Sequence, residues 1–161
     1  MVNNSDKIDE LDRKILSLIQ EDSRLTMQQI AKSIGNISKV AVSYRLKKLE
    51  DREIIERYNA KLNPEKLDRG YLVISRAMCN VKGQKELEVS KKIARLPGIQ
   101  SVYGIFGDYD LMIVARTRNK EEAKKLLDKI NGIPGVTSSN TIVAHTVVKE
   151  SLSLDLSKTE S

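Results

Sequence analysis

The sequence predicts an α+β protein, with an N-terminal unit of three helices followed by a βαββαβ sheet domain. Apolar residues recur at helical spacing through residues 8–49, and the composition changes at Gly70 to long β-prone runs. Two segments, Leu96–Ser101 and Ile133–Ser138, each place a Pro-Gly pair after a predicted helix and before a predicted strand. This internal repeat predicts two βαβ halves, and therefore a ferredoxin-like sheet with both of its helices on one side.

Apolar spacing and capping residues define the three N-terminal helices. The second helix begins after Thr26, a good N-cap, and ends at Gly35, where a helix terminus favours a left-handed residue. Ser38 caps the third helix, and the first helix ends near Asp22. The apolar stripes consist of Ile8, Leu11, Ile15, Leu18 and Ile19 in the first helix, Met27, Ile30, Ala31 and Ile34 in the second, and Val42, Leu46 and Leu49 in the third.

The outer face of the third helix is basic and carries hydroxyl groups, and no acidic residue lies between Asp22 and Glu50. A tight turn containing Gly, followed by a capped helix with such a face, is typical of a DNA-reading helix-turn-helix. Phosphates would be attracted to the third helix and repelled by the start of the first. The opposed charges are those of Lys39, Arg45, Lys47 and Lys48 and those of Asp6, Asp9, Glu10 and Asp12.

We expect the third helix to contact DNA with two groups of side chains. Those opposite the apolar stripe should approach base edges, and those at its margins should approach phosphates. The alternative is an amphipathic helix pair whose lysines are simply solvated. The predicted base-reading residues are Val40, Ser43, Tyr44 and Lys47, and the other predicted DNA-binding residues are Ser38, Lys39, Lys48 and Arg57.

After Leu49 the helical spacing gives way to the β-prone pair Ile54 and Ile55, and Pro64 interrupts this run. We expect a short wing or linker strand here. The predicted organisation is a helix-turn-helix DNA-binding domain over 1–53, a linker or wing strand over 54–69, a ferredoxin-like oligomerisation domain over 70–149, and a flexible tail over 150–161.

Alternating strand and helix patterns define the sheet domain. Its expected strands are Tyr71–Val81, Ile99–Phe106, Tyr109–Arg116 and Val136–Val148. Its expected helices are residues 84–96, with Leu87, Val89 and Ile93 inward, and a helix capped by Asn119, with Ala123, Leu126, Leu127 and Ile130 inward.

The first strand is apolar on both faces, since Leu72, Ile74 and Met78 lie opposite its alternate apolar or small residues. The chain offers enough helix to cover only one side of the sheet. We therefore expect the other face to be buried against an identical sheet in a homodimer. His145, in the predicted last strand, is expected to be a sheet or interface residue.

Composition is ordinary for a globular protein and excludes several kinds of site. The chain has 161 residues, of which 40% are hydrophobic and 31% charged, and its net charge of +6 favours a polyanionic partner. A single cysteine, Cys79, excludes an intramolecular disulfide, and with a single histidine it leaves no credible metal cage. We expect no metal, no cofactor and no catalytic residues. Because no signal peptide or membrane-spanning run is present, the expected location is the cytoplasm.

The turn between the second and third predicted strands could hold a small ligand. Backbone N–H groups around Gly107 can hold a carboxylate, and Asp108 or Asp110 can accept from an ammonium group. The alternative is that this is only a favourable hairpin turn and that nearby hydroxyl residues are β-formers. Those hydroxyls, from an adjacent strand or a neighbouring subunit, are Ser138, Ser139 and Thr141.

Three segments carry a resemblance to a known family through their order and spacing: LDRKIL, then DSRLTMQQIAKSIGNISKVAVSYRLKKLEDREII, then GDYDLMIVA within the βαββαβ pattern. From Ile8 to Lys149 the chain resembles the Lrp/AsnC family, the feast-famine transcription regulators of bacteria and archaea. One departure is Arg52-Glu53, where the family more often has Gly ahead of the hydrophobic pair.

The resemblance implies a DNA-binding dimer whose C-terminal domain, of the RAM or ACT-like type, assembles further to tetramers or octamers. It also implies a small effector, usually an amino acid, bound between dimers. Two-fold symmetry would match a pseudo-palindromic operator in double-stranded DNA. On this basis the expected effector-binding residues are Gly107, Asp108, Tyr109, Asp110 and Thr141, and the neighbouring hydroxyl of Ser139 is expected to join them.

Two other functions remain open. ACT-like domains also regulate enzymes, so a metabolite-sensing module is one alternative, although a helix-turn-helix would have no obvious use in it. The other is an architectural DNA-binding protein that needs no effector. An enzyme is not expected, because Asp108 and Asp110 lie on one hairpin with no His or Lys partner evident.

Overall fold

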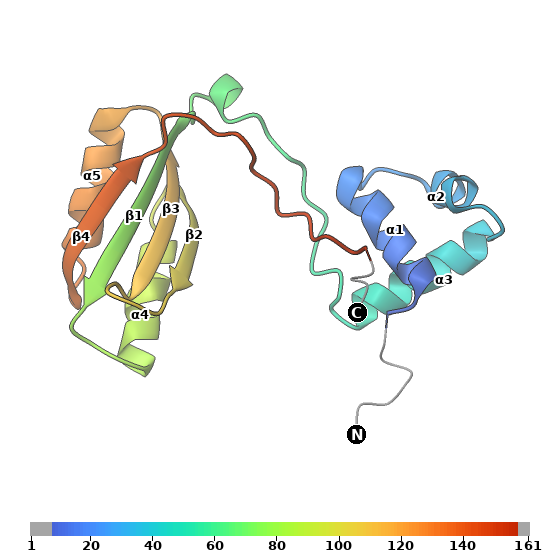
Figure 1. Ribbon diagram of the computed structural model, residues 1–161, viewed down its shortest axis with the longest axis horizontal. Coiled ribbons are helices and arrows are strands. Elements are labelled where there is room, and N and C mark those ends of the chain that lie inside the picture. Colours follow the sequence, from blue (N-terminus) through green and yellow to red (C-terminus); the bar gives the residue numbers. More distant parts are fainter. Residues whose placement is uncertain (1–7, 158–161) are drawn as a thin grey trace. The chain divides into compact units, whose positions relative to one another are not determined.

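The structure is a computed structural model that describes residues 8–157 and divides the chain into two units (Figure 1). Of the described residues, the helical unit comprises 8–61 together with 150–157. The sheet unit comprises Leu62–Lys149. The order of helices and strands confirms the predicted fold class, a helix-turn-helix unit followed by a βαββαβ domain.

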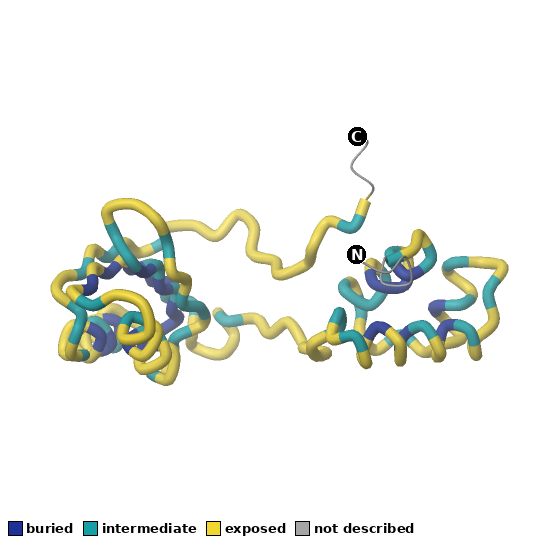
Figure 2. Tube along the Cα trace, turned by 90° about the horizontal axis from the view of Figure 1, so that it is seen from below, coloured by how far each residue is buried: buried dark blue, intermediate teal, exposed yellow. Residues whose placement is uncertain are grey.

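The helical unit contains α1 (Glu10–Glu21), α2 (Met27–Ile34) and α3 (Lys39–Asp51). The predicted caps are confirmed, since Thr26 accepts the N–H of Gln29 and Ser38 accepts the N–H of Ala41. Gly35 ends α2 with a φ of +72°, which a residue with a Cβ rarely adopts. The buried residues of the unit, drawn dark blue in Figure 2, include the core cluster of Ile15, Ile30, Val42 and Leu46 together with Leu16 and Leu49.

Residues 54–69, predicted as a wing or linker strand, are irregular apart from a short 3₁₀ helix, η2 (Glu65–Leu67). The predicted strand is wrong. Every strand in the described part of the chain belongs to the sheet unit, so Ile54 and Ile55 join no ladder within the single chain.

The chain turns sharply at the end of α3. Glu53 has a φ of +56°, and the N–H groups of Ile54 and Ile55 both donate to the carbonyl of Leu49. Glu53 therefore adopts the left-handed conformation that Gly would adopt more easily. Although Arg52-Glu53 lacks the Gly that the family more often has here, the turn still forms, with backbone strain at Glu53.

The sheet unit contains β1 (Tyr71–Cys79), α4 (Gln84–Ala94), β2 (Ile99–Gly104), β3 (Leu111–Thr117), α5 (Lys120–Asn131) and β4 (Val136–Val143). The strands form one antiparallel sheet in the order β2-β3-β1-β4, as the two βαβ halves predict. β4 stops at Val143 because β1 supplies its ladder, and the N–H of Ala144 makes the last bond, to Leu72. His145 lies beyond the strand and is exposed, so its predicted place in the sheet is wrong.

Both helices cover the same face of the sheet. The buried cluster joins alternate residues of β1 and β3 to Val89 and Ile93 of α4 and to the inner side of α5. Leu87, predicted to face inward, is 46% exposed, because it lies off the stripe that Val89 and Ile93 form. The remaining members of the cluster are Val73, Ala77, Cys79, Leu111, Ile113, Ala115, Ala123, Leu126 and Ile130.

The opposite face of the sheet, which we call the open face, carries no helix. Its residues alternate with those of the buried cluster and pair across strands, for example Ile74 with Ile142. Ile142 is 57% exposed, and Met78 and Tyr103 are also exposed. The other apolar members of the open face are Leu72, Met112 and Val114.

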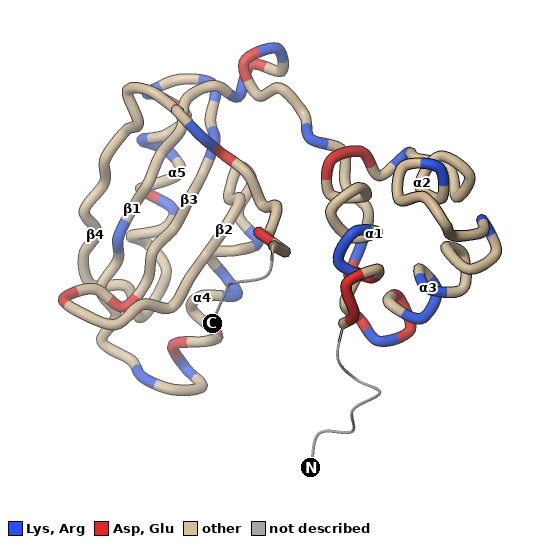
Figure 3. The backbone as a smooth tube through the Cα atoms, turned by 45° about the vertical axis from the view of Figure 1, so that its right-hand side comes forward, with Lys and Arg blue, Asp and Glu red and all other residues tan. Residues whose placement is uncertain are grey.

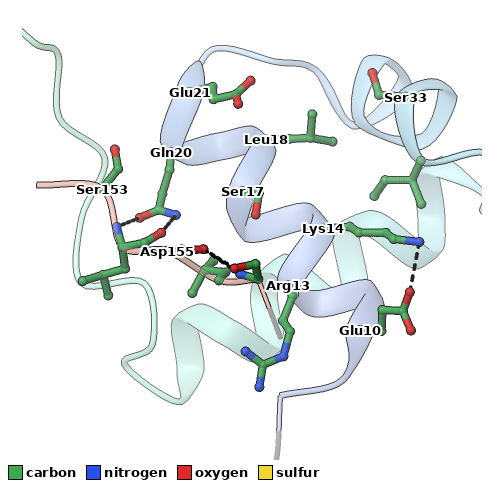
Figure 4. A pocket seen from close by; sticks show the side chains of 14 residues that line it. Glu10, Arg13, Lys14, Ser17, Leu18, Gln20, Glu21, Ser33, Ser153 and Asp155 are labelled. Atoms are coloured by element: carbon green, nitrogen blue, oxygen red, sulfur yellow. Dashed lines mark hydrogen bonds and ion pairs between the residues drawn. The ribbon is translucent and has the colours of Figure 1, made fainter. Parts of the chain in front are cut away.

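Residues 150–157 follow the sheet domain in sequence but group with the helical unit. The Gln20 side chain on α1 donates to the carbonyl of Leu154 and accepts its N–H, at 3.1 and 2.7 Å. Figure 4 shows these contacts beside a hollow of about 850 Å³, lined by α1, the end of α2 and residues 153–157. These contacts differ from the expected flexible tail, of which residues 158–161 lie outside the described residues.

Candidate nucleic-acid interface and ligand hairpin

The outer face of α3 is exposed, and two of its exposed members are apolar or aromatic. Val40 and Tyr44 have exposed fractions of 69% and 70%. Lys and Arg recur along α3, and neither α2 nor α3 before Glu50 carries an acidic residue (Figure 3). This face combines cations with groups able to contact base edges. The other exposed residues predicted to bind DNA are Ser38, Lys39, Ser43, Lys47, Lys48 and Arg57.

Arg45 lies on α3 but faces α1. Its Nη1 donates to Asp9 Oδ2 at 2.6 Å and to Asp12 Oδ1 at 2.7 Å, a contact set that we call the Arg45 clamp. By sequence position, Arg45 belongs with the lysines expected to attract phosphate, and the two aspartates with the carboxylates expected to repel it. The structure instead pairs these charges within the helical unit, while Asp6 lies outside the described residues.

The Arg45 clamp is joined to the N-terminal cap of α1. Asp9 accepts the N–H of Asp12 at 2.7 Å, and the Asp12 carboxylate accepts the N–H of Asp9 at 3.2 Å, so the two form a capping box. Burial opposes ionisation of Asp9, but the Asp12 N–H and the Arg45 guanidinium together hold its pKa below the ordinary value. The same two carboxylates therefore begin α1 and hold α3 against it.

The far end of α3 is tied to the linker. Tyr58 donates its hydroxyl proton to Glu50 Oε1 at 2.7 Å, and burial together with the Glu50 carboxylate raises the pKa of Tyr58 to about 12. Arg57, next in the chain, is exposed. This hydrogen bond limits how far Arg57 can move from α3.

The turn between β2 and β3 projects as a short hairpin. Gly107 is exposed with a φ of +127°, and a Cβ built there would meet no atom within 4 Å, so space is open around its backbone. The hairpin closes where Ile105 donates its N–H to the Asp110 carbonyl at 2.9 Å. Asp108 is exposed, and the Tyr109 ring lies 4.6 Å from the Arg76 guanidinium carbon.

Asp110 is held by contacts within the sheet unit. Its Oδ2 accepts the N–H of Cys79 at 2.7 Å, and its Oδ1 accepts from Lys82 Nζ. Lys82, and after it the Cys79 N–H, holds the pKa of Asp110 below its usual value. The sequence showed no lysine partner for this carboxylate and missed Lys82. The antiparallel pairing of β1 with β3 brings the end of β1, and Lys82 after it, to the start of β3. Only the predicted strand topology could have indicated Lys82 as a partner of Asp110.

The two hydroxyl residues predicted to bind effector do not meet the hairpin within one chain. Thr141 Oγ1 lies 2.8 Å from the hydroxyl of Ser75, which is only 2% exposed, so this hydroxyl already has a partner. Ser139 lies opposite Ala77 on β1. Because β1 separates β4 from β3, both residues are about 10 Å, two strand spacings, from the hairpin strand.

Other kinds of site find little support in the described residues. No group of three or more His, Cys, Asp or Glu residues is placed to hold a metal ion in that part of the chain. Burial, more than the nearby carboxylates of Asp110 and Glu86, raises the pKa of the Cys79 thiol, which disfavours a nucleophilic thiolate. No helix within residues 8–157 is both long and apolar enough to span a membrane.

Comparison with known families matches both units. The family model for the Lrp/AsnC ligand binding domain matches residues 76–154, and the model for a winged helix-turn-helix DNA-binding domain matches residues 8–56. An uncharacterised HTH-type transcriptional regulator of Pyrococcus furiosus is 39% identical over 92% of this chain and 99% of its own length. The HTH-type transcriptional regulator FL11 of the same organism is 33% identical over 91% of this chain and 95% of its own length.

Solved structures of transcriptional regulators also match this chain. An AsnC family transcriptional regulator from Agrobacterium tumefaciens matches with a TM-score of 0.86 and 25% identity, over 92% of this chain and 97% of that one. The transcriptional regulator NMB0573 from Neisseria meningitidis, solved as a complex with L-Met, also matches with a TM-score of 0.86 and 25% identity, over 93% and 97%. The chain therefore belongs to the Lrp/AsnC family, and it is a transcriptional regulator with a helix-turn-helix DNA-binding domain and a ligand-binding domain, not an enzyme.

Proposed function

We propose that the protein binds specific duplex sequences by placing α3 in the major groove. The observation that carries this proposal is the exposed pair Val40 and Tyr44 on a face that is otherwise basic and hydroxyl-bearing. Apolar and aromatic side chains on such a face suit contact with base edges and thymine methyl groups. Lys39, Lys48 and Arg57 suit phosphates, and the Ser38 hydroxyl, which accepts the N–H of Ala41, can still donate to one at the start of α3.

Replacing Ser43 with glutamate tests this docking. Ser43 lies beside Tyr44 on the exposed face, so Ser43→Glu should repel the phosphate backbone and abolish measurable binding to target duplex. Ser17→Glu, at an exposed position on α1, is the matched control and should bind as wild type does. Electrophoretic mobility shift at fixed salt measures both. Unchanged DNA binding by Ser43→Glu would contradict the placement of α3 in the major groove.

We also propose that an amino acid binds at the Gly107–Asp110 hairpin and changes assembly or DNA affinity. A bound L-Met in the Neisseria relative supports an amino acid as the ligand class. The exposed hairpin backbone offers N–H donors to a carboxylate, and Asp110 offers a charge to an ammonium group. Ser139 and Thr141 would have to be supplied by a neighbouring subunit, since those of the same chain lie two strands away.

The assembly that we propose is a homodimer formed through the open face, with further association to tetramers or octamers. A dimer with two-fold symmetry would bind a pseudo-palindromic operator whose half-sites lie about one helical turn, or a multiple of it, apart. A ligand held between dimers can change assembly only through its different affinity for the two states.

A second candidate function is an architectural DNA-binding protein that needs no effector. The observation that favours it is the Asp110 carboxylate, whose two oxygens are already engaged by Cys79 and Lys82 within the chain. Isothermal titration calorimetry of the whole protein against each amino acid decides between the two. Heat of binding from at least one of them is expected for a sensor, and no heat from any of them would favour the architectural function.

A further inference from the structure

The contact between Lys82 and Asp110 joins a mobile cation to a fixed anion. The Asp110 side chain is 18% exposed and is held from behind by the backbone N–H of Cys79 at 2.7 Å. The Lys82 side chain is 74% exposed and lies in the loop between β1 and α4. A lysine ammonium on a four-carbon stem moves easily, whereas the Asp110 carboxylate is fixed by the sheet. This ion pair can therefore open without disturbing the strands.

Lys82 Nζ occupies a position from which an ammonium group can pair with Asp110. It donates to Oδ1 of Asp110, the oxygen that Cys79 does not use. A ligand ammonium can take this place only if Nζ leaves, and an unpaired lysine would then remain beside the bound ligand. A ligand that carries a carboxylate next to its ammonium group satisfies both charges at once.

Resting on the proposed effector function, we propose that Lys82 and Asp110 recognise the zwitterionic head of an α-amino acid by exchanging partners. The ligand ammonium replaces Lys82 Nζ on Asp110, and Lys82 then binds the ligand carboxylate. Net charge at the site is the same before and after, and one exposed ion pair is replaced by two charge-assisted contacts. Arg76 of β1, whose guanidinium lies over the Tyr109 ring of the hairpin, also donates to Asn140.

The exchange would let the site select for the ammonium and carboxylate groups of the ligand, and not only for its side chain. An amine without the carboxylate would displace Lys82 and leave it unpaired. A carboxylic acid without the ammonium would bring a second anion to Asp110. Both kinds of analogue should bind more weakly than the amino acid, by about tenfold or more.

Calorimetry of the full chain tests the exchange with the amino acid that wild type binds most tightly, its decarboxylated amine and its deaminated acid. In Lys82→Met the affinity for the amino acid should fall about tenfold or more, while the affinity for the amine should be unchanged or higher, because the competing ammonium is gone. Lys82→Arg should retain most of the wild-type affinity. Lys85→Met, at an exposed lysine nearby on α4, is the matched control and should bind as wild type does.

Asp110→Asn provides the second arm, since its amide oxygen can still accept the N–H of Cys79 while its charge is lost. This variant should keep wild-type DNA affinity, which reports an intact fold, and lose binding of both amino acid and amine. Wild-type amino-acid affinity in Lys82→Met or in Asp110→Asn would overturn the exchange and leave the effector function standing. Absence of binding to the wild type by any amino acid would overturn the effector function and, with it, this exchange.

Discussion

Tyr44 and Lys48 are both exposed on α3, but they differ in what they can recognise on DNA. An aromatic side chain facing the groove contacts bases, whereas a lysine at the margin contacts phosphate. Tyr44→Ala should therefore lower the preference for target over random duplex, by about 1–3 kcal/mol. Lys48→Ala should weaken binding to both duplexes and reduce the salt slope by about one unit. Fluorescence anisotropy over a salt series measures preference and slope together.

The control for this pair is the salt slope of Tyr44→Ala, which should match that of wild type because no cation has been removed. If both variants lose target preference equally, the division into base-reading and phosphate-binding residues does not hold.

The exposed residues of α3 were predictable from the sequence, but the partners of its charged residues were not. Helical spacing predicts Val40, Ser43 and Tyr44 on one face of α3, because that spacing depends only on near neighbours in the chain. Arg45 and Asp110 were misjudged for the opposite reason. Asp12 lies 33 positions from Arg45, and Lys82 lies 28 positions from Asp110, so only the folded packing brings each pair together.

Among the secondary-structure elements, α1 and α3 are fixed to one another by the Arg45 clamp, with the Arg45 side chain 28% exposed. Removal of the guanidinium in Arg45→Met should lower the free energy of unfolding of the helical unit by about 1–3 kcal/mol. Binding to target and to random duplex should weaken together, because α3 loses its support. The salt slope should stay at the wild-type value, since this guanidinium is paired within the protein.

Arg24→Met is the control for this variant, because Arg24 forms a similar but more exposed ion pair, with Asp22, that does not reach α3. It should change neither stability nor DNA affinity. A reduced salt slope in Arg45→Met would show instead that Arg45 contacts phosphate. Urea unfolding followed by circular dichroism gives the stability of all three proteins.

The Arg45 clamp also predicts that the helical unit loses folding stability as the pH falls. Since the folded-state pKa of Asp9 is lowered from its ordinary value of 3.8, its stabilising contribution is present above that pH. The contribution is lost as the pH falls from 3.8 through the lower folded-state value. Over this range wild type should lose more stability than Arg45→Met, which lacks the guanidinium before acidification begins.

Helices and strands were predicted correctly where residues within the element itself determine where it begins or ends. Thr26 and Ser38 begin α2 and α3 as expected, because a capping hydroxyl acts on its own first turn. The strand predicted in the linker does not form within the single chain, because the β-propensity of Ile54 and Ile55 needs a partner strand and the only sheet among the described residues lies in the other unit. The place of residues 150–157 depends on Gln20, more than a hundred positions away, and no local pattern predicts it.

At the scale of the whole molecule, the order of the four strands followed from the repeated Pro-Gly segments, which define the two βαβ halves. The open face exposes Met78, Tyr103 and Ile142 together on one side of the sheet, unlike the singly scattered apolar residues of ordinary monomers, so a partner is expected there. The sequence predicted that face through the alternation of β1, but no intrachain contact tests what covers it.

Ile142→Lys tests the proposed homodimer in the full chain. Ile142 lies opposite Ile74 on the open face and is 57% exposed, so a lysine there leaves the buried cluster untouched but places two charges within a symmetric apolar interface. Leu87→Lys is the matched control, because Leu87 is 46% exposed on α4, on the side of the sheet that the helices cover. Analytical ultracentrifugation at micromolar concentration should give a folded monomer for Ile142→Lys and a dimer or larger assembly for wild type and Leu87→Lys.

Because a monomer presents only one α3, Ile142→Lys should also bind a single half-site as tightly as it binds the full pseudo-palindrome, whereas wild type should prefer the full site. Sedimentation of Ile142→Lys at the wild-type size would place the dimer contact elsewhere on the molecule.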